Sequence, residues 1–181
     1  MHRRQPLPRL WLMTDERQGE GLWAALERLP KGAGVVFRHY RTAADERRRL
    51  FGRVRAIARR RRLVLLLAGP PGLARAWRAD GCHGRWRRSR GLILSAPAHS
   101  RAEIVAAERA GADLLFVSPV FATRSHPRAR PLGKVRFGCL AGSARLPVIA
   151  LGGMDEARAR ALAGFRLYGW AGIDSWATDP A

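Results

Sequence analysis

Two glycines that directly follow an apolar run are the residues of this chain best suited to bind an anion. The segment Pro147–Leu151 has the pattern of a buried strand, and Gly152 and Gly153 stand where that strand would turn towards a helix beginning near Asp155. Backbone N–H groups left free at such a turn bind phosphate and similar anions. A tight turn without a ligand gives the same pattern, so the surrounding elements must decide between the two.

Histidines form a second group that could carry chemistry, because an imidazole exchanges its proton near neutral pH and serves as an acid or a base. His126 lies in a loop rich in Pro and Arg that we expect over 119–132, and His83 and His99 lie near predicted strand ends. Each has a structural alternative. A loop histidine is commonly solvated, and a histidine at a strand end is commonly held by a hydrogen bond.

The chain is strongly basic. Its 181 residues carry a net charge of +20, and every basic residue except Lys31 and Lys134 is an arginine. A nucleic-acid or acidic-membrane surface is one interpretation, with its best patches at 59–62 and around Trp86 in 85–90. The charge is spread along the chain, which favours arginines on solvated helix faces instead. We therefore expect no nucleic-acid partner; such a binder would show steeply salt-dependent binding to any duplex.

Apolar runs alternate with helix-like segments along the whole chain. Eight short strands are predicted, at 10–14, 35–37, 63–67, 81–84, 91–95, 113–118, 148–151 and 167–173. Helices are predicted between most of them, at 20–29, 43–60, 72–78, 100–109, 134–141 and 155–163. We expect Thr42 to cap the second helix and Ser100 to cap the fourth.

This alternation indicates parallel strands joined by crossover helices. Eight such units favour a closed (β/α)8 TIM barrel, one domain over 1–181. The barrel is shortened, because 85–90 is too short for a fourth helix and the tail after Trp176 is too short for an eighth. A homo-oligomer in which a second subunit covers these thin units stays open. The carboxyl ends of the strands form the mouth of such a barrel, and among them Asp15 and Asp174 supply the acidic groups.

The chain shows no segment that would direct it to or through a membrane. The apolar run after Pro8 breaks at Thr14 and Asp15, too early for a signal segment, and no later run reaches the length of a membrane span. Cys82 and Cys139 are too few and too far apart for a disulfide framework or a metal site. We expect a soluble protein of the reducing cytoplasm.

Several predicted strand ends together resemble the thiamine phosphate synthase and thiazole tautomerase (TenI-like) family. The resemblance covers nearly the whole chain, and its most specific parts are ERAGADLLFVSPVFAT and PVIALGGM. The matching segments, in order, are LWLMTD at 10–15, ADGCHG at 79–84, LSAPAHS at 94–100, ERAGADLLFVSPVFAT at 108–123, PVIALGGM at 147–154 and GIDS at 172–175.

The resemblance implies a reaction between two phosphorylated small molecules. In the synthases an aminopyrimidine methyl diphosphate ionises, and a thiazole phosphate attacks the resulting cation while diphosphate leaves. Both halves of the site stabilise anions with preorganised donors. The resemblance implies that Arg38 and Ser95 contact the diphosphate. The residues it assigns to the thiazole phosphate and the nearby hydroxyl-rich loop are Thr123, Ser125, Gly152, Gly153 and Ser175.

The same resemblance implies magnesium, and here the chain departs from the family. The family's acidic ligands after the third and fourth strands fall on Ala68-Gly69 and within 85–88, where this chain has no carboxylate. Mg²⁺ prefers carboxylate oxygens. We therefore predict that the magnesium ligands are lost and name no metal ligand and no certain cofactor. Arg85, Arg87, Arg88 and Arg124 are candidates to replace the metal charge, because arginine clamps phosphates.

Two further functions within the barrel stay open. A thiazole tautomerase would use a histidine just after the sixth strand, but Pro119 stands there, and His126 further along the loop is the remaining acid or base. A barrel that binds a phosphate ester without catalysis would keep the glycines and need neither group. The synthase, the tautomerase and the non-catalytic barrel would all have small phosphate esters as their partners.

Overall fold

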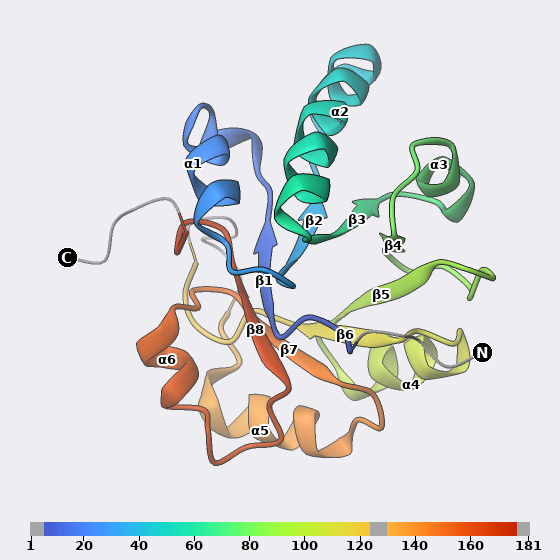
Figure 1. The fold of residues 1–181 in the computed structure, drawn as a ribbon. Helices are drawn as coiled ribbons and strands as arrows, with labels where there is room; N and C mark the ends of the chain where they lie inside the picture. The colour runs from blue at the N-terminus through green and yellow to red at the C-terminus, as the bar shows by residue number, and fades with distance from the viewer. Residues whose placement is uncertain (1–5, 124–129, 177–181) are drawn as a thin grey trace.

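Eight parallel strands close into a barrel in the computed structural model, which describes residues 6–123 and 130–176 (Figure 1). Each strand pairs with the next, and β8 returns to β1, with Leu10 opposite Trp170. The strands are β1 Leu10–Met13, β2 Gly34–Phe37, β3 Val64–Ala68, β4 Gly81–His83, β5 Ile93–Ala98, β6 Leu114–Val117, β7 Val148–Leu151 and β8 Gly169–Gly172. The predicted (β/α)8 barrel is confirmed.

Six helices surround the strands in the described part of the chain (Figure 1). They are α1 Gly21–Arg28, α2 Ala44–Arg61, α3 Pro71–Ala76, α4 Arg101–Arg109, α5 Gly133–Ser143 and α6 Glu156–Arg160. The cap predicted at Ser100 is confirmed, since its side chain accepts the Glu103 N–H. The cap predicted at Thr42 is wrong. Ala43 precedes α2, and no side chain caps that helix, so α2 is held by packing rather than by a cap.

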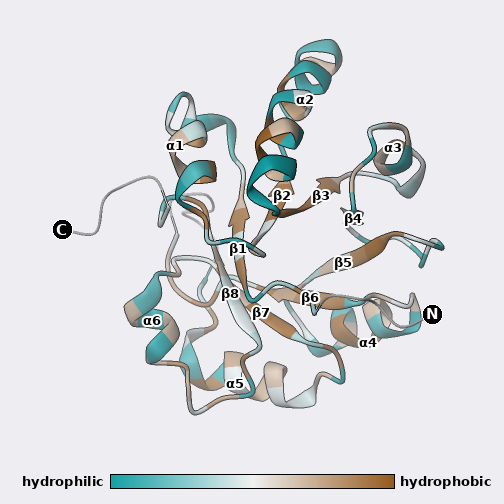
Figure 2. Cartoon of the chain, viewed as in Figure 1, coloured by the Kyte–Doolittle hydropathy of each residue, from teal (hydrophilic) through white to brown (hydrophobic). Residues whose placement is uncertain are grey.

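Alternating side chains divide the core into two parts, as the two-residue period of a strand requires. One set fills the barrel, where Trp11 and Phe116 meet edge to face with centroids 5.4 Å apart. Gly34 leaves room for the Trp11 ring, because a Cβ there would overlap it. The other set packs between strands and helices. Figure 2 shows the result, with hydrophobic residues gathered on the strands and hydrophilic ones along the helices.

In the part of the chain that the structure describes, the fourth and eighth β/α units lack a helix, as the sequence predicted. No helix lies between β4 and β5, and none follows β8 in the described residues. Trp176 occupies part of the space of the eighth helix. It stacks on Trp170 at 5.0 Å, and its Nε1 donates to the Trp11 carbonyl at 3.2 Å. One indole thus covers the outer face of β8 beside β1.

None of the helices in the described ranges combines the length and apolar character needed to cross a membrane.

Candidate functional site

The ends of β1 and β2 bring an aspartate and an arginine together at the barrel mouth. Val36 points into the barrel, so Arg38, two residues later, leans over the same opening. Arg38 Nη2 lies 2.8 Å from Asp15 Oδ2, and Arg38 Nε donates to the Thr14 carbonyl at 2.7 Å. Arg47 braces this corner by donating to the carbonyls of Arg38 and Ala68. The Arg38 guanidinium is therefore oriented before any ligand arrives.

Asp15 is held in its ionised form. Burial alone would raise the pKa of this carboxyl, but hydrogen bonds from Arg17 and the charges of Arg38 and Arg17 outweigh it and lower the pKa below its usual value. Gln18 on the following turn donates to the Ile173 carbonyl at 2.8 Å and ties this corner to the end of β8. Asp15 thus acts as a fixed negative charge that partly neutralises Arg38.

The last residue of β4 and the interior of β5 supply a buried histidine and a buried serine. The predicted strand at 91–95 in fact runs over Ile93–Ala98, so Ser95 lies within β5 rather than at its end. Ser95 is fully buried, and its Oγ lies 2.9 Å from His83 Nδ1. The His83 ring meets Phe116 edge to face at 5.2 Å. Burial, helped by the charge of Arg38, lowers the pKa of His83 to about 4, so the imidazole is neutral at neutral pH.

The ends of β7 and β8 form a cradle made largely of backbone. Gly152 and Gly153 have φ of 96° and 59°, a conformation that L side chains rarely adopt. A Cβ on Gly152 would stand 2.7 Å from Pro119 Cα, because the loop after β6 runs against this turn. Phe121 N donates to the Gly152 carbonyl at 3.1 Å. Two glycines are therefore required here both for conformation and for close packing.

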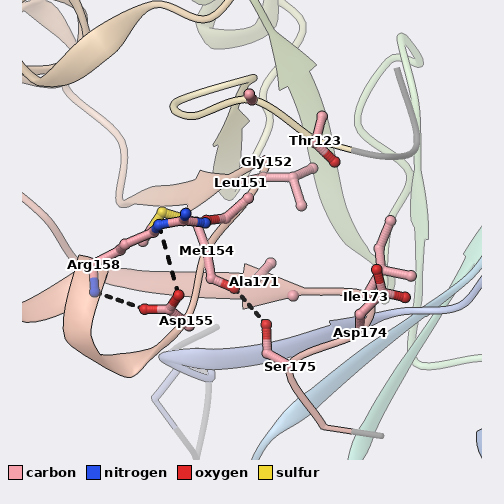
Figure 3. A pocket seen from close by; sticks show the side chains of 13 residues that line it. Thr123, Leu151, Gly152, Met154, Asp155, Arg158, Ala171, Ile173, Asp174 and Ser175 are labelled. Atoms are coloured by element: carbon pink, nitrogen blue, oxygen red, sulfur yellow. Dashed lines mark hydrogen bonds and ion pairs between the residues drawn. The ribbon is translucent and has the colours of Figure 1, made fainter. Parts of the chain in front are cut away.

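A pocket of about 340 Å³ opens over this cradle between β7 and β8 (Figure 3). Within the described residues, the N–H groups of Gly153 and Met154 donate to no backbone carbonyl. Ser175 Oγ donates to the Met154 carbonyl and Arg158 Nη1 to the Gly153 carbonyl, which fixes the turn from both sides. Free amides at the wall of a pocket, with an arginine beside them, are donors for an anion.

The structure separates the residues predicted for the site into three groups. Gly152, Gly153, Ser175 and Thr123 all line this one pocket. Arg38 lies at the rim after β2 and Ser95 is buried within β5; the charge of Arg38 helps to lower the pKa of His83, the partner of Ser95. Ser125 and His126 lie outside the described residues, as does Arg124.

Two of the four arginines considered as substitutes for magnesium, Arg85 and Arg88, pair with carboxylates of neighbouring elements. Arg85 forms an ion pair with Glu103 on α4, and Arg88 Nη2 lies 3.4 Å from Asp113 Oδ1. Asp113 directly precedes β6, at the amino ends of the strands and away from the mouth, whereas Glu103 lies in the first turn of α4. Arg38 is thus the guanidinium that the described part of the chain places at the β1–β2 rim.

The residues near β3 and β4 do not fit a magnesium ion. Ala68 ends β3 and Gly69 follows it, so neither offers a side-chain oxygen. The donors that follow are His83, which is buried and hydrogen-bonded, and Ser95. In the described residues no group of three or more His, Cys, Asp or Glu side chains could hold a metal ion. The donor set is nitrogen and hydroxyl, whereas Mg²⁺ takes carboxylate oxygens.

Sequence reasoning missed two side chains of the mouth, those of His39 and Arg158. Thr14 Oγ1 lies 2.9 Å from His39 Nδ1, and the His39 ring stacks on Phe37 at 4.6 Å, which buries it. His39 has a positive φ of 44° that no sequence pattern announces. Arg158 was also missed, although its position one turn after Asp155, the N-cap of α6, could have indicated that it faces the cradle.

A closed barrel of eight parallel strands, with its pocket at the carboxyl ends of the last two, places this chain among the (β/α)8 barrels. A family profile described as thiamine monophosphate synthase matches residues 10–176. The chain belongs to the thiamine monophosphate synthase family.

Individual relatives agree. The chain is 33% identical over 179 residues to a protein of Aquifex aeolicus assigned as a second thiamine-phosphate synthase, covering 92% of this chain and 96% of the relative. It is 30% identical to the thiamine-phosphate synthase of Chloroflexus aurantiacus, over 83% and 76% of the two chains. Among solved structures it is similar to thiamine phosphate pyrophosphorylase from Pyrococcus furiosus, with a TM-score of 0.78, 26% identity and coverage of 96% and 89%.

Proposed function

We propose that this protein forms thiamine phosphate by joining an aminopyrimidine methyl diphosphate to a thiazole phosphate. The observation that carries the proposal is the β7–β8 pocket, in which the amides of Gly153 and Met154 face no carbonyl partner in the described residues. Membership of the thiamine monophosphate synthase family supports this reaction, and backbone amides at the pocket wall support binding of the thiazole phosphate there.

Arg38 is proposed to hold the diphosphate on the other side of the mouth. In the reaction the bond between the methylene carbon and the diphosphate oxygen breaks, the electron pair leaves with diphosphate, and the thiazole nitrogen forms the new bond. An oriented guanidinium stabilises the charge that develops on the leaving oxygens. Because the donors around Ala68 and His83 do not suit magnesium, the proposed reaction uses Arg38 without a metal at those positions.

The test is thiamine phosphate formation from the two purified precursors, with magnesium and with EDTA. The proposal expects product in both samples at equal rates. Arg38→Met should lower kcat/KM by about a hundredfold or more, whereas Arg101→Met, an exposed arginine on α4, should leave it unchanged. Absence of product under both conditions overturns the proposal, and product only with magnesium overturns its metal-free form.

A barrel that binds a phosphate ester without turning it over is the second candidate. It is favoured by the ion pair between Asp15 and Arg38, which reduces the positive charge available for diphosphate. Calorimetric binding of thiazole phosphate by a protein that forms no product would identify this function.

A further inference from the structure

Helix α2 carries arginines on two faces that differ in how the fold uses them. On the face towards α1, Arg60 and Arg61 pair with Glu27, and the Arg53 guanidinium lies 4.0 Å from the centroid of the Trp23 ring. These arginines fasten two helices together. Figure 1 shows α1 and α2 next to each other, and Figure 2 shows hydrophilic residues along much of α2.

The other face is different. Arg55 and Arg59 are one helical turn apart, and with Arg78 they line a separate pocket of about 150 Å³. In the described part of the chain none of the three makes a hydrogen bond or an ion pair through its guanidinium. Three like charges around one concavity repel one another, and an anion bound between them removes that repulsion.

The pocket lies away from the barrel mouth. Its floor includes Leu63 and Leu65 at the start of β3, and Asp80, which directly precedes β4. The mouth is at the opposite, carboxyl ends of these strands. Arg78, two residues after the end of α3, has a φ of 57° and lines the pocket. A ligand here would not touch the residues assigned to the proposed reaction.

Charge and size define the ligand. Three guanidinium groups and the Asp80 carboxylate sum to two positive charges, which suits a dianion. Asp80 accepts the Leu65 N–H at 2.8 Å, which holds its carboxylate at the floor of the pocket. A volume of about 150 Å³ corresponds to about five waters, enough for one phosphate group.

We propose that Arg55, Arg59 and Arg78 form a second anion site, which binds one phosphate group, either as free phosphate or as the end of a phosphate monoester. This site is independent of the proposed thiamine phosphate synthesis.

The experiment follows backbone amide signals of the ¹⁵N-labelled protein during titration with inorganic phosphate at low salt. Saturable shifts at Arg78 and Asp80 report the second site, and shifts at Gly153 report the mouth. Arg55→Gln/Arg59→Gln should weaken the response at Arg78 on the order of tenfold or more and leave that at Gly153 unchanged. The matched control, Arg101→Gln/Arg109→Gln, removes the same charge from exposed positions on α4 and should change neither.

Three arms sharpen the result. Asp80→Asn removes one negative charge while keeping an acceptor for Leu65 N–H, and should tighten phosphate binding. Adenosine monophosphate in place of phosphate shows whether the site accepts an ester. Lack of a saturable shift at Arg78, or equal weakening in both double variants, overturns the proposal. So does a response along all of α2 to a 20-nucleotide oligomer with none to phosphate, which would mark a nucleic-acid surface.

Discussion

One side of the barrel mouth is formed mainly by backbone and the other mainly by side chains. Beside β7 and β8 the cradle is made largely of backbone, with Gly152 and Gly153 in positive-φ conformations at the wall of a pocket. Beside β4 and β5 the walls are side chains, with His83 and Ser95 bound to each other inside the barrel. In the described residues the amides of Gly153 and Met154 donate to no backbone carbonyl, whereas His83 Nδ1 and Ser95 Oγ are bonded to each other.

The difference has a physical consequence for each side. A backbone cradle depends on two residues that have no side chain, so almost any substitution damages it. A buried side-chain pair depends on mutual hydrogen bonding and on the neutral state of His83, so it responds to pH and to loss of either partner. Four predictions test this contrast, the first having the largest expected effect.

Gly152→Ala should be the most damaging change. The methyl group would require a strained φ of 96° and would meet Pro119, costing about 2–4 kcal/mol of unfolding free energy and most of the phosphate affinity. Urea unfolding and phosphate titration measure the two effects. Gly142→Ala is the control, because its Cβ meets nothing within 4 Å and lies in α5, where alanine is the better helix former. Equal stability of the two variants would mean that the cradle is not conformationally restricted.

Acid should weaken the side-chain side. The folded pKa of His83 is about 4, while that of the unfolded chain is about 6.5, so between these values the unfolded state takes up a proton that the folded state refuses. The contribution of His83 to the free energy of unfolding is fully present above pH 6.5. It is lost as pH falls towards 4, by about 1.4 kcal/mol per pH unit and about 3 kcal/mol in all. Burial also lowers the pKa of His39, which acts in the same direction.

Unfolding free energies of the parent and His83→Gln, measured across that pH range, isolate the share of His83. The variant should show a shallower decline below pH 6.5. Identical slopes for the two proteins would show that His83 does not titrate as its burial requires.

Ser95→Ala should cost about 1–3 kcal/mol of unfolding free energy, because His83 Nδ1 would then be buried without its partner. Ser143→Ala is the matched control. Its hydroxyl donates to the Leu140 carbonyl at the exposed end of α5, and its loss should stay within about 0.5 kcal/mol. Thermal unfolding of both variants measures the two losses of unfolding free energy. Similar losses would show that the buried hydrogen bond stabilises the fold no more than the surface one.

Ser175→Ala should have the smallest effect, below about 1 kcal/mol in phosphate affinity. Its hydroxyl supports the cradle through the Met154 carbonyl, while the amides of Gly153 and Met154 stay in place. Calorimetric titration with inorganic phosphate measures the change. A loss as large as that in Gly152→Ala would show that the hydroxyl, rather than the backbone, binds the anion.

The sequence predicted the barrel well because strand and helix periods are local. The strand at 148–151 was placed correctly, and the missing helix after β4 followed from a simple count of residues. Glycines announced the backbone side of the mouth, since few other residues adopt their conformation. The pair of His83 and Ser95 could not be derived, because hydrogen bonding across two strands depends on register, and β5 extends three residues beyond its predicted end.

The carboxylate partners of the arginines also could not be predicted from the sequence. Arg38 and Arg85 both follow strands, yet one leans over the mouth and binds Asp15, whereas the other turns outwards to Glu103. Which carboxylate an arginine reaches depends on side-chain packing that local patterns do not encode. A chain with 34 basic and 14 acidic residues leaves many equivalent choices open.

The seam between β1 and β8 shapes how the chain must fold. It joins positions 10 and 170, so the first strand made waits for the last before it gains its second neighbour. Until then the growing sheet has two open edges, which are templates for pairing with other chains. Closure of so long a loop is slow compared with local hairpin or helix formation. Trp176 follows β8 in the chain and contacts both strands of the seam, through the Trp170 ring and the Trp11 carbonyl. It can therefore stabilise the barrel only after β8 has paired with β1.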